Sequence, residues 1–368
     1  MLLMTPGPTP SPEFLRRAMA KESIHHRTPE FEAIFERVRN RLKAFMGSSE
    51  VIFLASTGSG AMESALTHFC ARRALTINAG KFGERWSKIA KAYGKNPLEL
   101  KYGWDTPAKI EDIENALKNN PEIDALFIQV CESSGGLRHP VEAIAGAAKA
   151  LRSDLFVIAD GITAVGVERF DTANIDALIV GSQKAFMLPP GLAAIGLSQK
   201  AVKHIESTGG AGFYFNLATE LKNQRKNTTA WTAATTIIQG LDAFFAELDG
   251  GGEDSFYAAT IRRHEAGTAA LKAIGARIYP LAPALSMLSV FHPKASEIRK
   301  WIKKEARVNA GGGQDDLKDT LIRINNMGFV LPSEIAWSLN AVEIAMDKIG
   351  ARKYDGAANR VFTETYYR

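Results

Sequence analysis

One lysine in a short motif is the residue whose chemistry can be read most directly from this sequence. Residues 177–180 (Ala-Leu-Ile-Val) predict a short buried strand, which is followed by Lys184 and then by Pro-Pro-Gly at 189–191. Lysine forms a Schiff base with an aldehyde, and burial beside Phe186 and Met187 would lower the pKa of its amine so that it can attack. The motif therefore suggests that Lys184 carries pyridoxal phosphate (PLP). Taken alone, it fits an ordinary surface lysine better, because 45 of the 368 residues are Lys or Arg.

A glycine-rich turn upstream has the features of a phosphate site. Residues 56–60 (Ser-Thr-Gly-Ser-Gly) follow a strand predicted at 51–55 and precede a helix predicted to begin near Ala61. Glycines permit a tight turn, small side chains let backbone N–H groups approach a ligand, and the positive end of the helix faces the turn. The turn lacks the lysine of the GxxxxGK[ST] loop and the GxGxxG pattern of dinucleotide-binding folds. On this piece alone, a strand-turn-helix connection without a ligand is an equally good interpretation.

Buried strands alternate with helices between residues 51 and 197. Further strands are predicted at 75–78, 125–130, 155–159 and 193–197, with helices at 109–119 and 141–151. This alternation predicts an α/β fold with a mainly parallel central sheet and helices on both faces.

Five residues lie at the carboxyl ends of predicted strands, where open α/β sheets bind their ligands. They are Ser59, Phe82, Ser133, Asp160 and Lys184. Phe82 could stack on a flat ring, and a core phenylalanine is the competing interpretation. Because separate strands bring these five residues to one edge of the sheet, the sequence predicts a single ligand site there.

The rest of the chain predicts an extended arm and a smaller second domain. Four prolines within residues 1–14 exclude a helix there and favour an extended segment that lies on another surface. After three glycines at 250–252, strands predicted at 285–291 and 320–324 alternate with helices at 255–274, 295–305 and 333–348. We therefore expect an N-terminal arm (1–14), a large domain (15–250) and a small α+β domain (251–368).

Composition limits the classes of function. Hydrophobic residues make up 46% of the chain and charged residues 23%, as in soluble globular proteins. No signal peptide or membrane span is apparent, so the expected location is the cytoplasm. The net charge of +5 is dispersed, which does not imply nucleic acid and suits anionic small molecules. Cys70 and Cys131 form no disulfide framework, and His25-His26 has no further ligand at metal spacing, so no metal is predicted.

The motifs, in their order along the chain, resemble a known family. They are TPGPTP, HHRTPEFEAIFERV, STGSGAMESAL, NAGKFGERW, ESSGG, ADGITAVG, GSQKAFMLPPG and LIRINNMG. Together they resemble the class V aminotransferases of the fold-type I PLP enzymes, and within them the alanine–glyoxylate/serine–pyruvate branch. The resemblance covers nearly the whole chain, and GSQKA followed by PPG is its most specific part. It implies a homodimeric transaminase that moves an amino group from a small L-amino acid to a 2-oxo acid.

The resemblance also implies a role for each matching residue. Lys184 would form the Schiff base and move the substrate Cα proton, and Asp160 would pair with the pyridine nitrogen. The other cofactor contacts would be Ser59, Gly60 and Ala61 on the phosphate with Gln183 beside it, Phe82 on the ring, Ser133 near the ring hydroxyl, and Thr232 on the phosphate of the partner subunit. Arg323 would hold the substrate α-carboxylate, because its planar guanidinium matches a carboxylate in two hydrogen bonds. Without the resemblance, a structural ion pair of Arg323 with Asp or Glu would be the better interpretation.

Three positions differ from the family pattern. Thr232 is followed by Ala233 rather than proline, Thr229 stands where a tyrosine is common, and Cys131 replaces a residue that is usually polar.

Other functions remain open on the sequence. A lyase or desulfurase shares the fold, but a desulfurase needs a cysteine on a mobile loop, which neither cysteine provides. A scaffold without activity would be expected to have lost Lys184 or Asp160, and a nicotinamide-dependent dehydrogenase lacks support without GxGxxG.

Overall fold

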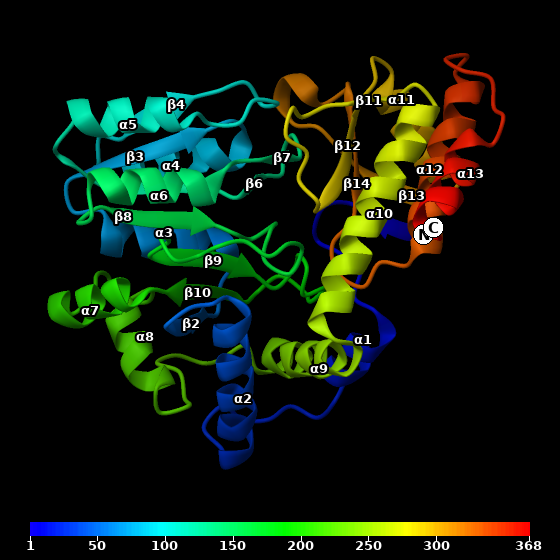
Figure 1. Ribbon diagram of the computed structural model, residues 1–368. Coiled ribbons are helices and arrows are strands. Elements are labelled where there is room, and N and C mark those ends of the chain that lie inside the picture. The colour runs from blue at the N-terminus through cyan, green and yellow to red at the C-terminus, as the bar shows by residue number, and fades with distance from the viewer.

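The computed structural model describes all 368 residues, and a seven-stranded sheet forms its centre (Figure 1). Its strands, in spatial order, are β2 (Glu50–Leu54), β10 (Ala193–Leu197), β9 (Ala177–Gly181), β8 (Phe156–Asp160), β5 (Ile123–Gln129), β3 (Arg73–Asn78) and β4 (Leu98–Lys101). All neighbouring pairs are parallel except those of β10, which is antiparallel to both β2 and β9. β2, β9 and β10 are buried along their whole length, which explains why they read as continuous apolar runs.

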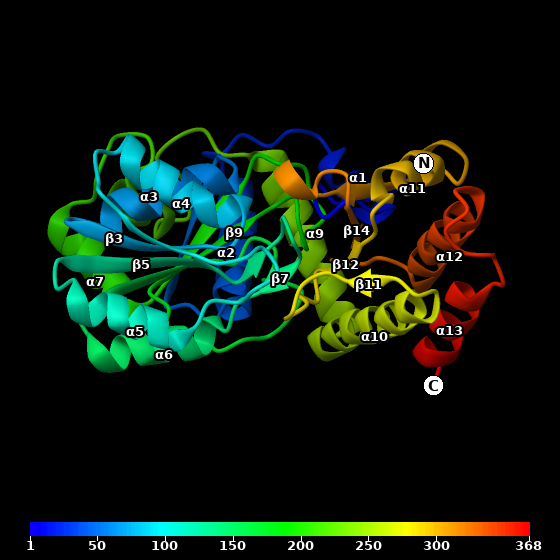
Figure 2. The same ribbon diagram turned by 90° about the horizontal axis from the view of Figure 1, so that it is seen from above.

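Helices cover both faces of this sheet, and each face has its own apolar core. One face is covered by α2 (Pro29–Phe45), α5 (Ile110–Asn119), α6 (Val141–Leu151) and α9 (Thr235–Gly251). The other is covered by α3 (Gly58–Phe69), α4 (Lys81–Ala92), α7 (Gln199–Thr208) and α8 (Leu217–Gln224). In the view from above, the sheet lies between these two layers (Figure 2). The predicted α/β fold is therefore confirmed.

A second, five-stranded sheet lies beside the first (Figure 1). Its strands are β1 (Leu2–Met4), β13 (Val308–Gly312), β14 (Leu321–Asn325), β12 (Met287–Phe291) and β11 (Arg277–Ile278). Its core is shared with α10 (Glu253–Ala273), α11 (Ala295–Lys304), α12 (Pro332–Lys348) and α13 (Ala357–Tyr366). A short hairpin, β6 (Cys131–Glu132) with β7 (Leu137–Arg138), projects from the large sheet towards this second sheet.

The N-terminal arm packs on other parts of the same chain. β1 pairs in parallel with β13 of the same chain, and α1 (Glu13–Met19) follows the arm. The domain boundaries expected near residues 14 and 250 stay predictions, and β1 joins the first residues of the chain to the sheet of the C-terminal part.

Further differences concern one helix start and several short strands. The helix after the glycine-rich turn begins at Gly58 rather than near Ala61, so that Ser59 and Gly60 lie in its first turn. Strands β4, β6, β7, β11 and β13 were not predicted. No helix combines the length and the apolar character needed to cross a membrane.

Candidate active site

Lys184 lies just beyond the carboxyl end of β9, in a buried loop. The loop is fixed by backbone bonds from Ser182 N to the Leu192 carbonyl and from Met187 N to the Lys184 carbonyl, both 2.9 Å. The Lys184 side chain is 8% exposed, and its Nζ donates a 2.5 Å hydrogen bond to the Pro6 carbonyl. Burial lowers the pKa of the amine from its ordinary 10.5 to about 8. A much larger fraction of this amine is therefore neutral near pH 8 than is the case for a surface lysine.

The N-terminal arm covers Lys184, which the sequence did not predict. Thr9 Oγ1 donates to the Lys184 carbonyl (2.7 Å), and Ser11 Oγ donates to the Met187 carbonyl (2.5 Å). Gly7 has a φ of +107°, and a Cβ there would lie 2.7 Å from Lys184 Nζ. Only glycine combines this backbone with such a close approach to the lysine. The TPGPTP motif indicated an extended segment but not the surface that it covers.

Asp160 ends β8 and lies near Lys184. It is 6% exposed, and its Oδ1 accepts a 2.9 Å hydrogen bond from the Ile162 N–H. Burial raises the pKa of this carboxyl to about 6, against the opposing effects of the Ile162 hydrogen bond and of the Arg85 and Lys184 charges. The neighbouring position on β5 is Gln129, whose side-chain Oε1 and Nε2 are both buried without a partner.

The first turn of α3 is suited to an anion. It contains Ser59, Gly60 and Ala61 and no acidic residue, and its N-cap residue makes no side-chain hydrogen bond to the helix. A Cβ at Gly60 would lie 2.1 Å from Ser56 Oγ, so only glycine allows this close packing. In the loop after β9, the buried Oε1 of Gln183 has no partner. The N–H groups of Gly60 and Ala61 donate to the Thr57 carbonyl at 3.0 and 3.4 Å, whereas the Ser59 N–H has no partner. The Ser59 N–H at the positive end of the helix and the unsatisfied amide of Gln183 fit the phosphate group of PLP.

Arg85 was missed by sequence reasoning, because it is one of many cations. Its Nη1 donates a 3.1 Å hydrogen bond to Ser59 Oγ, and its guanidinium carbon lies 4.8 Å from the centre of the Phe82 ring. The charge of Arg85 also acts on Asp160 and Lys184. The only signal in the sequence that could have identified Arg85 was its position three residues after Phe82 in a predicted helix.

Phe82 lies in the first turn of α4, and its backbone N–H donates to the Glu132 carboxylate (3.1 Å). Ser133 follows Glu132 and is buried, and its carbonyl accepts a hydrogen bond from Arg323 Nη1. The ESSGG motif thus contacts Phe82, which is expected on the ring, and Arg323, which is expected on the substrate.

Arg323 lies on β14 and is half-buried. Its Nε and Nη2 donate to the Gly312 carbonyl at 2.8 and 2.5 Å. None of the ion pairs in the structure includes Arg323, so the alternative of a structural ion pair is not observed. Burial lowers the pKa of the guanidinium to about 10, and the charge of Glu132 opposes this shift. With three hydrogen bonds made, two of its five N–H donors are left for a ligand.

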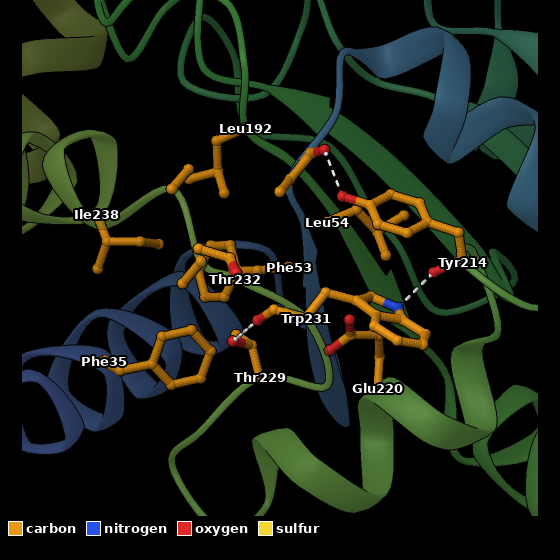
Figure 3. A pocket seen from close by; sticks show the side chains of 13 residues that line it. Phe35, Phe53, Leu54, Leu192, Tyr214, Glu220, Thr229, Trp231, Thr232 and Ile238 are labelled. Atoms are coloured by element: carbon orange, nitrogen blue, oxygen red, sulfur yellow. Dashed lines mark hydrogen bonds between the residues drawn. The ribbon is translucent and has the colours of Figure 1, made fainter. Parts of the chain in front are cut away.

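Thr232 is not brought to Lys184 in this chain. It is exposed and lines an apolar pocket at the end of β2 with Phe53 and Leu192 (Figure 3). Trp231 in the same loop donates from Nε1 to the Tyr214 carbonyl (2.9 Å). Thr229 donates from Oγ1 to the Trp231 carbonyl (2.5 Å), within this loop.

Both cysteines are buried, and burial raises the pKa of each thiol to about 12. Cys131 Sγ lies 3.4 Å from Ser286 Oγ. No group of three or more His, Cys, Asp or Glu side chains is placed to hold a metal ion.

Known proteins resemble this chain over its whole length. The sequence model of the family described as aminotransferase class-V matches residues 12–288. An uncharacterized aminotransferase of Helicobacter pylori strain J99 is 49% identical over 368 residues, which cover 100% of both chains. The serine–glyoxylate aminotransferase of Methylorubrum extorquens is 29% identical, with 96% of this chain and 93% of the relative covered. The solved structure of an aspartate aminotransferase from Thermus thermophilus matches with a TM-score of 0.85 at 26% identity, covering 99% of this chain and 100% of the other.

The contact of the arm with Lys184 generates a prediction. Gly7→Ala should slow the covalent attachment of PLP to the cofactor-free protein by on the order of tenfold or more, because the added Cβ displaces the amine. Visible absorbance after addition of PLP measures the rate. Gly94→Ala is the control, since Gly94 also has a positive φ (+69°) but nothing within 4 Å of its Cβ position. Equal rates for Gly7→Ala and the native protein would show that the arm does not position Lys184.

Proposed function

This chain belongs to the class V aminotransferase family and is a PLP-dependent aminotransferase, and we propose that it transfers the amino group of a small L-amino acid to a 2-oxo acid. Alanine, serine and aspartate are the proposed donors, and glyoxylate and pyruvate the proposed acceptors. The similarity to a serine–glyoxylate aminotransferase supports the pairing with glyoxylate. A matrix of donors against acceptors, measured on the purified protein, decides among them. The cytoplasmic location expected from the sequence stays a prediction.

The buried amine of Lys184 beside Asp160 is the observation that carries this proposal. When bound, PLP supplies an aldehyde that takes up the amino group and a ring that accepts electrons from the substrate Cα. The Lys184 amine, with its lowered pKa, would hold the cofactor through its aldehyde and would move the proton at the substrate Cα. A carboxyl with a pKa of about 6 is mostly ionised at neutral pH, so Asp160 can hold a proton on the pyridine nitrogen.

The remaining residues hold and orient the cofactor. We assign the phosphate to the first turn of α3, with Ser59, Gly60 and Ala61, and to Gln183 beside it. Phe82 is assigned to the face of the ring and Ser133 to its hydroxyl group. Hydrogen bonds from α3 would hold the phosphate group, and Lys184 would be the residue to which the aldehyde is attached.

A lyase or desulfurase on this fold is disfavoured by the cysteines. A desulfurase attacks the substrate sulfur with a thiolate. Both Cys70 and Cys131 are buried with a thiol pKa of about 12, so neither is ionised at neutral pH. The comparisons give this alternative no better support than the transaminase.

The test of the proposed attachment uses pH. An amine attacks an aldehyde only when it is neutral, so PLP uptake by the cofactor-free protein should rise about tenfold per pH unit below pH 8 and level off above it. Visible absorbance against time measures the rate. The Lys184→Ala variant should show no increase in visible absorbance from attached PLP and no amino transfer. A rate that still rises between pH 8 and pH 10 would contradict a buried Lys184 as the attacking amine.

We further propose that Arg323 binds the α-carboxylate of every amino donor. Its two free donors and its position on β14, against the carbonyl of Ser133, support this role. A fixed carboxylate determines which Cα bond stands perpendicular to the ring and therefore which bond breaks.

Arg323→Lys tests this assignment. The ammonium keeps the charge but loses the planar fork, so kcat/KM should fall by on the order of tenfold or more for each donor while PLP affinity stays nearly unchanged. Steady-state kinetics and PLP titration measure the two quantities. Loss of PLP or early melting, with donor kinetics preserved, would make Arg323 a structural residue.

We also propose a homodimer whose two sites lie at the subunit boundary. Thr232 is exposed on a loop beside the exposed side chains of Phe213 and Tyr214, which supports an interface at this surface. Thr232 would then reach the PLP phosphate of the partner subunit. Light scattering of the purified protein should give the mass of a dimer, and an active monomer would contradict this proposal.

A further inference from the structure

Glu132 is a fully buried carboxylate that the proposed reaction does not use. It ends β6, is 0% exposed, and its pKa is raised by burial against several hydrogen bonds. We propose that Glu132 is a positioning residue, whose carboxylate fixes the first turn of α4 and thereby holds the Phe82 ring against the cofactor. This inference rests on the proposed function of Phe82.

The geometry around Glu132 connects it to Phe82. Its Oε2 accepts from Gly83 N at 2.8 Å and from Phe82 N at 3.1 Å. Its Oε1 accepts from Ser134 N at 3.1 Å and from Ser134 Oγ at 2.5 Å, and Ser134 Oγ in turn accepts from Lys81 N at 3.2 Å. The carboxylate therefore binds the start of α4 on one side and its own hairpin on the other.

The helix supplies no cap of its own at this end. Gly80 is the N-cap residue of α4 and has no side chain to offer, so Glu132 takes the place of a capping residue. A Cβ at Gly80 would lie 2.3 Å from Ser134 Oγ and 2.7 Å from Glu132 Cδ. Glycine at this position is what lets the carboxylate approach the N–H groups, and these together with the helix dipole stabilise its charge.

The charge of Glu132 also reaches the other residues of the site. It opposes the lowering of the Arg323 pKa by burial and contributes to the raised pKa of Asp160. One carboxylate thus connects the residues assigned to the ring face, the ring nitrogen and the substrate. A buried ionised group is costly unless it is paired and hydrogen-bonded, and the hydrogen bonds to Glu132 come from Phe82, Gly83 and Ser134.

The chain contains a second carboxylate with the same structural role. Glu343 on α12 is also 0% exposed and accepts from Ala357 N at 3.2 Å and Ala358 N at 2.9 Å, at the start of α13. Its ion pair is with Arg352, in the small domain. Glu343→Gln therefore measures how much the stability of the protein falls when a buried carboxylate is removed from a helix start outside the candidate site.

The experiment compares Glu132→Gln with Glu343→Gln in the PLP-bound protein. Both should lower the midpoint of thermal unfolding. Only Glu132→Gln should raise the dissociation constant of PLP, by about tenfold, and weaken the visible circular dichroism of the bound cofactor, because the ring loses its fixed neighbour. Equal PLP affinity and equal circular dichroism in the two variants would overturn the inference.

A double-mutant cycle tests whether Glu132 acts through Phe82. In a Phe82→Leu background, Glu132→Gln should change PLP affinity less than twofold, because the ring that it positions is already absent. If Glu132→Gln weakens PLP binding in the Phe82→Leu background by the same factor as in the native protein, Glu132 does not act through Phe82. If Glu132→Gln does not fold, Glu132→Asp is measured in the same way, since it keeps the charge but shortens its reach.

Failure of this inference is distinguishable from failure of the proposed function. A native protein that does not attach PLP at Lys184 would overturn the proposed function itself. If the native protein attaches PLP at Lys184 and the Glu132→Gln variant binds PLP as the native protein does, only the role of Glu132 is overturned.

Discussion

Removal of the Lys184 amine from water is the constraint on which the rest of the structure depends. A lysine ammonium is costly to bury, and the protein lowers its pKa to about 8 by enclosing it from several sides. The strand end of β9, the N-terminal arm and the segment after β14 all contribute to this enclosure. Gly328 in that last segment packs on the loop that carries Lys184, since a Cβ there would lie 2.4 Å from Met187 Sδ and 3.1 Å from the Ala185 carbonyl. The environment of one amine is thus assembled from parts of the chain that are distant in sequence.

The hairpin of β6 and β7 ties the two sheets together around this site. Ser289 Oγ on β12 donates to the Gly135 carbonyl at 2.7 Å, and Ala284 N donates to the Gly136 carbonyl at 2.9 Å. Arg323 adds a hydrogen bond to the carbonyl of Ser133. On the far side of β14, the buried Arg263 binds the Gly328 carbonyl at 3.1 Å and the Asn326 side chain at 3.1 Å. The Arg323 guanidinium is therefore held between the two sheets.

The strands and the strand-end residues could be predicted from the sequence because their signals are local. β2, β9 and β10 are continuous apolar runs, and glycines lie at the end of β9 and in the turn after β2. The contacts of the arm could not be predicted in this way, since pairing of β1 with β13 has no local pattern. Arg85 and Glu132 were missed for another reason: a charged side chain shows its partners only once the strands that carry them lie side by side. The start of α3 was placed too late because glycines argue against a helix, although at Gly58 they permit the close contact with Ile162.

The pairing of β1 with β13 also has a consequence for biosynthesis. Leu2 pairs with Val308, so the first residues to leave the ribosome must wait for a strand that is made near the end of translation. The seven strands of the large sheet, which end at Leu197, can be complete long before that. During this interval β1 lacks its partner strand, whereas the partners of Pro6, Thr9 and Ser11 in the Lys184 loop have already been made. The two ends of the arm therefore obtain their partners at different stages of synthesis.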